Sequence, residues 1–194
     1  METIHFATWI DAPVERCFLL ALSIDLHVFS ANRSREKAID GVTSGLISEG
    51  ETVTFQGRHF GLRFKHKSRI EVLRPYSHFR DVMVKGAFRR FAHDHHFAAM
   101  DDGTRMRDEV RYDAPLGPLG RIVARKRLVP FLEERNWVLK QVAESEEWRK
   151  YLNSSVVGRV ASIWTAPALG WNSIALLRGA DGLGLPPVPT VSGG

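Results

Sequence analysis

Alternation of apolar and polar side chains across the middle of the chain is the feature that most restricts its fold. From residue 38 to residue 114, bulky apolar residues recur at every second position, and turn-forming residues interrupt the pattern. The segment 62–72 is the clearest case, because its odd-numbered positions are all charged and its even-numbered positions are mainly apolar. One face of such a strand must lie in water while the other faces a core. The pattern predicts a meander of about five or six antiparallel strands.

Further elements are expected on both sides of this region. Residues 2–10 alternate like a strand, and Asp-Ala-Pro at 11–13 precedes apolar residues at helical spacing over 14–21. A short helix is expected over 25–30 and a long one over about 121–152. A sheet with one apolar face needs an apolar cover, which only the long helix can supply. The sequence therefore predicts an α+β fold in which a curved antiparallel sheet wraps around a long C-terminal helix.

The chain is expected to divide into one domain, residues 1–152, and a C-terminal extension, residues 153–194. Within the extension, the segment 160–177 carries no charge, but proline, glycine and asparagine interrupt it. Its length is at the lower limit for crossing a bilayer. We expect a poorly ordered or partly helical extension; docking on a membrane or a partner protein is the alternative interpretation.

Charge and cysteine content restrict the partners and the compartment. The formal charge is +5 and the isoelectric point about 9.7, but the basic residues are spread over strand faces and the late helix. Because no nucleic-acid motif accompanies them, nucleic acid is not an expected partner. The single cysteine, Cys17, excludes an internal disulfide, and the first residues lack the features of a secretory signal. A cytoplasmic location is expected, with Cys17 as a buried structural thiol.

The most informative polar residues are histidines and aspartates on neighbouring strands. His93 and His95 share one face of a strand, because side chains alternate across it. The turn at 101–103 sets a register in which His95 lies opposite Asp108, and the preceding turn brings Asp81 beside the histidines. The predicted concave face of the sheet carries these polar side chains: His66, Ser68, Asp81, His93, His95, Asp108 and Tyr112.

Three interpretations of this polar set remain open. Buried carboxylates are costly unless paired, so the set can be a network that only holds the strands together. It can instead orient a ligand's carbonyl or hydroxyl, or relay a proton, with His93, His95 and Asp108 as candidate catalytic residues. A metal site is the third, because His-x-His on a strand points two imidazoles the same way, as in cupin barrels. The cupin glutamate and second-motif histidine are absent, and although Asp81 or Asp108 could complete three ligands, the spacing does not require it. No metal or other cofactor is therefore assigned.

Several short motifs follow one another in the order of the expected elements. They are Asp11-Ala-Pro13, the run from Gly57 to His66, Phe79-x-Asp81, Gly86-x-Phe88, His93-x-His95-x-Phe97, Thr104-x-Met106-x-Asp108 and the turn from Pro115 to Gly120. Over roughly residues 1–150, this series resembles the SRPBCC superfamily, which includes START-related lipid carriers, pollen-allergen-like proteins and aromatic polyketide cyclases. It is most similar to an uncharacterised bacterial subgroup that is also found joined to nucleotide-sugar-epimerase-like proteins. That subgroup often has Trp where this chain has Phe91, a conservative difference.

The resemblance implies a helix-grip fold with an apolar cavity between the sheet and the long helix. It does not carry over catalytic residues, because carriers and cyclases share this fold without sharing one set of functional side chains. We expect a carrier or sensor of a small hydrophobic ligand of aromatic, polyketide-like or lipid type. The expected cavity wall consists of Phe64, Ile70, Met83, Phe97, Met106 and Tyr112, faced by Val138, Leu139 and Val142 of the long helix. The alternatives are a cyclase- or dehydratase-like enzyme and an interaction module for a partner enzyme, and the sequence leaves the oligomeric state open.

Overall fold

The computed structural model describes residues 1–59 and 62–153, which form one antiparallel sheet and the helices that pack on it. In chain order the elements are β1 (Glu2–Ile10), α1 (Val14–Ala21), α2 (Ile24–Ser30), the 3₁₀ helix η1 (Asn32–Ser34), β2 (Lys37–Gly41), β3 (Thr52–His59), β4 (Leu62–Arg74), β5 (His78–Lys85), β6 (Arg90–Met100), β7 (Gly103–Asp113), α3 (Gly117–Ala143) and the 3₁₀ helix η2 (Glu146–Lys150). Apart from Asn153, the predicted C-terminal extension lies outside the described residues.

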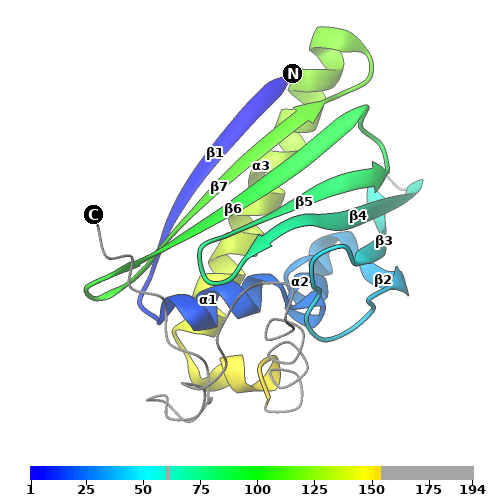
Figure 1. Cartoon of the computed structure of the whole chain (residues 1–194). Helices are drawn as coiled ribbons and strands as arrows, with labels where there is room; N and C mark the ends of the chain where they lie inside the picture. The colour runs from blue at the N-terminus through cyan, green and yellow to red at the C-terminus, as the bar shows by residue number, and fades with distance from the viewer. Residues whose placement is uncertain (60–61, 154–194) are drawn as a thin grey trace.

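The sheet has the strand order β1-β7-β6-β5-β4-β3-β2, and every neighbouring pair is antiparallel. Figure 1 shows α3 crossing one face of this sheet along its length, with α1 and α2 at one end. We call the face toward α3 the inner face and the opposite one the outer face. The arrangement is the predicted helix grip, and β2 to β7 are the strands that the alternating pattern predicted.

α3 differs at both ends from the predicted helix over 121–152. It begins at Gly117, because Leu116 reverses the chain with a φ of 67° and Pro118 supplies a fixed φ in the first turn. It ends at Ala143, and Ser145 then accepts a hydrogen bond from the Glu147 N–H to cap η2. In the described part of the chain, none of the helices combines the length and the apolar character that crossing a membrane requires.

Aromatic packing fixes α1 against the sheet. Phe18 of α1 meets Tyr76, Phe79 and Phe97 edge to face, with ring centroids 5.8, 5.7 and 5.3 Å apart. A second apolar cluster joins β7 to α3, where Tyr112 also donates a 3.2 Å hydrogen bond from its hydroxyl to the Arg121 carbonyl. The two clusters hold α1 and α3 against the same sheet.

A β-bulge in β4 changes which side chains face inward. The pairing with β5 shifts between Ile70 and Val72, so Glu71 is an extra residue that breaks the alternation. Val72 pairs with Arg80 on the outer face, while Leu73 packs against the core. The sequence prediction that Val72 shares the face of Ile70 is therefore wrong.

Candidate functional site

Neighbouring strands bring the predicted polar residues together on the inner face of the sheet. In the β6–β7 hairpin, His95 is the partner of Asp108, which is the register predicted from the turn at 101–103. In the β5–β6 pair, Asp81 is the partner of His93. The alternation of β-strand side chains therefore gathers four ionisable groups from β5, β6 and β7 on one face.

Asp108 is the most deeply buried carboxylate of this set, with its side chain 1% exposed. It accepts hydrogen bonds from His93 Nε2 at 2.9 Å, His95 Nδ1 at 2.7 Å and Asn136 Nδ2 at 2.7 Å. Asn136 belongs to α3 and was not singled out by the sequence analysis. The sequence signal that could have found it is its helical spacing with Leu132 and Leu139, which puts Asn136 on the apolar face of the helix. A buried amide on that face needs a hydrogen-bond partner.

Asp81 forms the accessible end of the set. Its Oδ2 atom lies 3.4 Å from His95 Nε2 and 3.9 Å from His93 Nδ1, and its Oδ1 accepts a 3.4 Å hydrogen bond from Ser68. Ser68 Oγ is in turn 2.9 Å from His66 Nε2. The Asp81 side chain is 18% exposed, compared with 3% for both His93 and His95. Six of the predicted polar residues thus form one hydrogen-bonded series, and Tyr112 lies apart from it.

Burial and neighbouring charges shift the pKa values of the two histidines in opposite directions. Burial, helped by the charge of His95, lowers the pKa of His93 to about 4. Burial also opposes protonation of His95, but the hydrogen bonds and charges of Asp108 and Asp81 outweigh it and raise the pKa. Burial disfavours the charged aspartates too, yet their histidine partners lower the pKa of both. The imidazole contacts therefore keep two carboxylates ionised inside the fold.

The apolar side chains predicted to line a cavity divide into two groups. Those that are fully buried in the protein core are Ile70, Phe97, Met106 and Tyr112. Met83 is only half-buried and Phe64 is exposed. Of the wall residues predicted on α3, Leu139 and Val142 are buried and Val138 is half-buried. Among the predicted wall residues on the sheet, Met83 and Phe64 are therefore the ones that a ligand can reach without opening the core.

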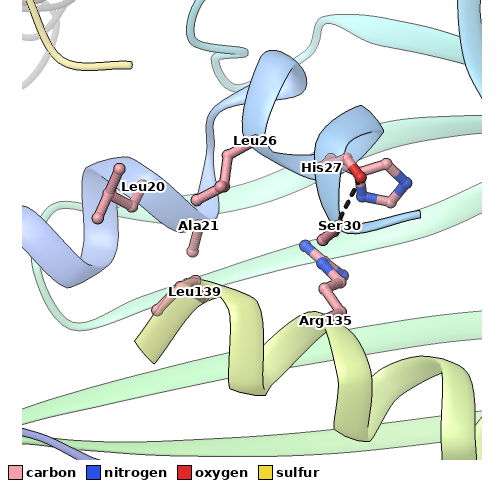
Figure 2. Close-up of a pocket in the computed structure, with 7 residues that line it drawn as sticks. All are labelled: Leu20, Ala21, Leu26, His27, Ser30, Arg135 and Leu139. Atoms are coloured by element: carbon pink, nitrogen blue, oxygen red, sulfur yellow. Dashed lines mark hydrogen bonds between the residues drawn. The ribbon is translucent and has the colours of Figure 1, made fainter. Parts of the chain in front are cut away.

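A small pocket lies between α1, α2 and α3 (Figure 2), and Leu139 is the one residue that it shares with the predicted cavity wall. Its lining residues are Leu20, Ala21, Leu26, His27, Ser30, Arg135 and Leu139. The cavity volume is about 10 Å³, which is room for about one water molecule. Ligand pockets measure about 300–1,000 Å³, so this pocket does not hold a ligand in its present form.

His27 and Arg135 link this pocket to the polar set, and neither was singled out from the sequence. Figure 2 shows Arg135 reaching from α3 toward Ser30 of α2. The charge of Arg135 acts on Asp81 and helps to lower its pKa. His27 Nε2 lies 3.2 Å from Glu36 Oε2, while burial lowers the pKa of His27. A cation and an imidazole therefore border the polar set on the side of the helices.

The outer face carries a second group of histidine, aspartate and arginine residues. Asp94, 4% exposed, accepts hydrogen bonds from His78 Nε2 at 2.8 Å, Arg80 Nε at 2.7 Å and Arg111 Nη2 at 2.8 Å. The His96 ring stacks on that of His78, with centroids 4.6 Å apart. Burial opposes ionisation of Asp94, but the three donors outweigh it and lower its pKa to about 2. Alternation along the strand is enough to put Asp94 on the face opposite His93 and His95, but it gives no indication that the Asp94 side chain is covered.

Comparison with known proteins finds the fold in several solved structures. No protein-family profile matches the chain, and no curated protein matches it in sequence. A START superfamily protein from Mycobacterium smegmatis aligns with a TM-score of 0.57 at 10% identity over 73% of this chain and 97% of that one. The di-domain ARO/CYC protein BexL, from the BE-7585A biosynthetic pathway, aligns with a TM-score of 0.56 at 17% identity over 74% of this chain and 50% of its own. The major latex-like protein 151 from Panax ginseng aligns with a TM-score of 0.52 at 12% identity over 74% and 98% of the two chains.

These similarities define a class of protein by its architecture. The chain has the helix-grip fold of START-like proteins, which confirms the predicted fold class and, at the level of fold, the resemblance to the SRPBCC superfamily. Proteins with a common fold carry out many unrelated functions, so the activity has to be argued from the site itself.

Proposed function

We propose that this protein binds a small apolar molecule between the sheet and α3, with a polar atom of that molecule on Asp81. The observation that carries the proposal is the exposure of Asp81, which is 18% accessible although its partners His93 and His95 are buried. Ligand sites typically combine apolar walls with a few fixed polar groups. Asp81 is such a group, because Ser68 and His95 hold its two oxygens in place.

Aromatic side chains beside this polar end support an apolar ligand. Phe88 and Phe91 lie with ring centroids 5.4 Å apart, and Phe91 meets the His66 ring at 5.6 Å. Both phenylalanines and Phe131 of α3 are only partly buried. Partly buried aromatic rings can move apart to admit a ligand at a smaller cost in free energy than side chains packed inside a closed core. We therefore expect the ligand to enter beside these rings and to contact Met83.

Fluorescence titration with N-phenylnaphthylamine, a neutral apolar dye, tests this proposal. We expect saturable binding of one dye molecule per wild-type chain. Met83→Trp places a large ring at the proposed site and should weaken binding at least about tenfold, or 1.4 kcal/mol. Val84→Trp is the matched control, because Val84 is the next residue of β5 and is exposed. Equal dye affinity in the two variants, or no saturable binding to the wild-type protein, would contradict the proposal.

Proton transfer of the cyclase or dehydratase type is a second candidate function. Two observations favour it: the Asp81 side chain is accessible, and His95 contacts both Asp81 and the buried Asp108. A carboxylate and an imidazole in contact can accept and return a proton when one of them reaches the substrate. Native mass spectrometry of protein from its own host can identify a bound compound for use as the test substrate. Conversion by the wild type but not by Asp81→Asn supports catalysis, whereas an unchanged compound leaves binding as the function.

A further inference from the structure

We infer that Asp81, His93 and His95 form a binding site for one divalent transition-metal ion of the zinc type. One ligand atom of each side chain lies within 4.8 Å of the others. Two imidazoles and a carboxylate are a common ligand set for such ions. The inference rests on the geometry of these residues and does not depend on whether the protein also binds an apolar ligand.

The distances from Asp81 to the two histidines are long for charged hydrogen bonds and close to those between ligands of one metal ion. Its Oδ2 atom is 3.4 Å from His95 Nε2 and 3.9 Å from His93 Nδ1. Hydrogen bonds between charged nitrogen and oxygen usually measure about 2.7–2.9 Å, and the contacts of the same histidines with Asp108 fall in that range. Around a tetrahedral ion with bonds of about 2.1 Å, neighbouring ligand atoms lie about 3.4 Å apart. The strand register thus already places Asp81 Oδ2 close to the separation that a metal ion requires from a nitrogen of each histidine, and all three side chains offer a ligand atom within 4.8 Å of the others.

Asp108 supplies the outer contacts that a metal-binding histidine needs. It holds Nε2 of His93 and Nδ1 of His95, which leaves the opposite nitrogen of each ring directed toward Asp81. Metal-bound histidines characteristically donate their second N–H to a carboxylate, which fixes the tautomer and the ring orientation. Asn136 holds the other oxygen of Asp108 at 2.7 Å. The histidine nitrogens that would bind the ion are therefore oriented in advance.

The exposure of Asp81 and the charges around it are consistent with a metal ion at this position. An ion beside Asp81 would lie at the accessible end of the set, where three protein ligands leave a fourth position for water or another small ligand. The carboxylates of Asp81 and Asp108 would balance a dication if both imidazoles are neutral. Arg135 opposes the ion, because its charge acts on Asp81 from α3. The set nevertheless holds two carboxylate charges against the single charge of this partly exposed guanidinium.

The outer group on the same strands is a weaker candidate and a useful control. His78, Asp94 and His96 also have ligand atoms close together. However, both oxygens of Asp94 accept hydrogen bonds from the guanidinium groups of Arg80 and Arg111. A metal ion would have to displace these cations, and like charges beside it would weaken its binding.

Zinc titration of the untagged full-length protein tests the inference. The protein is treated with EDTA, dialysed and titrated with Zn²⁺ by calorimetry, and its zinc content is measured by elemental analysis. We expect one zinc ion per wild-type chain. Asp81→Asn should weaken zinc binding at least about a hundredfold, beyond the range typical of losing an outer-sphere partner. His96→Ala, which changes the residue beside His95 on the outer face, should leave zinc affinity unchanged.

Three results would overturn the inference. The first is a wild-type protein that takes up no zinc, and the second is equal zinc affinity of the wild type and Asp81→Asn. The third is loss of zinc in His96→Ala but not in Asp81→Asn, which would assign the ion to the outer group. Circular dichroism shows whether each variant is folded, and Asp81→Ser replaces Asp81→Asn if that variant is not.

Discussion

Asn136, on α3, donates a 2.7 Å hydrogen bond to Asp108, on β7, and so joins the helix to the sheet at the centre of the polar set. Both side chains are buried, so water does not replace the bond when it is lost. The same carboxylate orients His93 and His95. One amide therefore connects the position of the helix with the geometry of the candidate site.

Replacing this amide should destabilise the protein measurably. Asn136→Ala removes a hydrogen bond to a buried charge, and we expect a loss of about 1.5–3 kcal/mol in the free energy of unfolding. Trp137→Ala is the control, since Trp137 is the next residue of α3 and is 61% exposed; it should change stability by less than about 0.5 kcal/mol. Urea unfolding of both variants measures the difference. Similar small losses in the two variants would show that the bond between Asn136 and Asp108 contributes little.

On the outer face, Asp94→Asn should also lower stability. The substitution removes the charge that His78, Arg80 and Arg111 share. We expect a loss of about 1–3 kcal/mol, less than for a fully buried ion pair, because both arginine side chains are 32% exposed. Asp101→Asn makes the same change in the exposed β6–β7 turn and should have almost no effect. Unfolding in urea at neutral pH compares them, and equal stability of the two variants would contradict this account.

The inner face of the sheet could be predicted because it follows from local rules. Alternation assigns side chains to a face, and the short turn at 101–103 fixes which residues of a hairpin are partners. These two rules are enough to place His95 opposite Asp108, as the structure has it. They fail at Glu71, where one extra residue in β4 reverses the alternation without any signal in the pattern.

Contacts between distant elements could not be predicted in the same way. Asn136 meets Asp108 because α3 packs at a particular height and rotation on the sheet, which no short stretch of sequence specifies. Asp94 is buried because two arginines on neighbouring strands fold over it, although alternation alone indicates a side chain in water. The pocket beside His27 and Arg135 likewise depends on how α2 and α3 approach each other.

The pH dependence of stability should reveal the buried imidazole of His27. Burial is the main cause that lowers its pKa from the usual 6.5; the charge of Arg135 acts in the same direction, and Glu36 and Asp81 oppose it. The folded protein therefore binds this proton less readily than the unfolded chain. The stability that the neutral, buried His27 contributes is fully present above pH 6.5, the pKa of the unfolded chain. It is lost as the pH falls through the lower pKa of His27 in the folded protein.

The variant His27→Gln should remove this pH dependence while keeping a polar partner for Glu36. Metal-free wild-type protein should lose more unfolding free energy than His27→Gln when the pH falls from about 7 to about 5. Because other histidines titrate in both proteins, the difference between the two slopes isolates His27. Urea unfolding in the presence of EDTA at each pH gives these slopes, and equal slopes would show that His27 is protonated as readily in the folded state as in the unfolded chain.

The thiol of Cys17 should react only when the protein unfolds. Cys17 is fully buried on α1, and its Sγ lies 3.8 Å from the Ala12 carbonyl oxygen, to which it donates. Burial raises the pKa of Cys17 to about 11, so about a thousandth of the thiol is thiolate, the reactive form, at about pH 8. Iodoacetamide should therefore leave the folded protein unlabelled at this pH and modify it fully in concentrated urea. Mass spectrometry counts the labels unambiguously, because the sequence contains one cysteine. Rapid labelling of the folded protein would mean that α1 opens far more often than its packing against Phe79 and Phe97 implies.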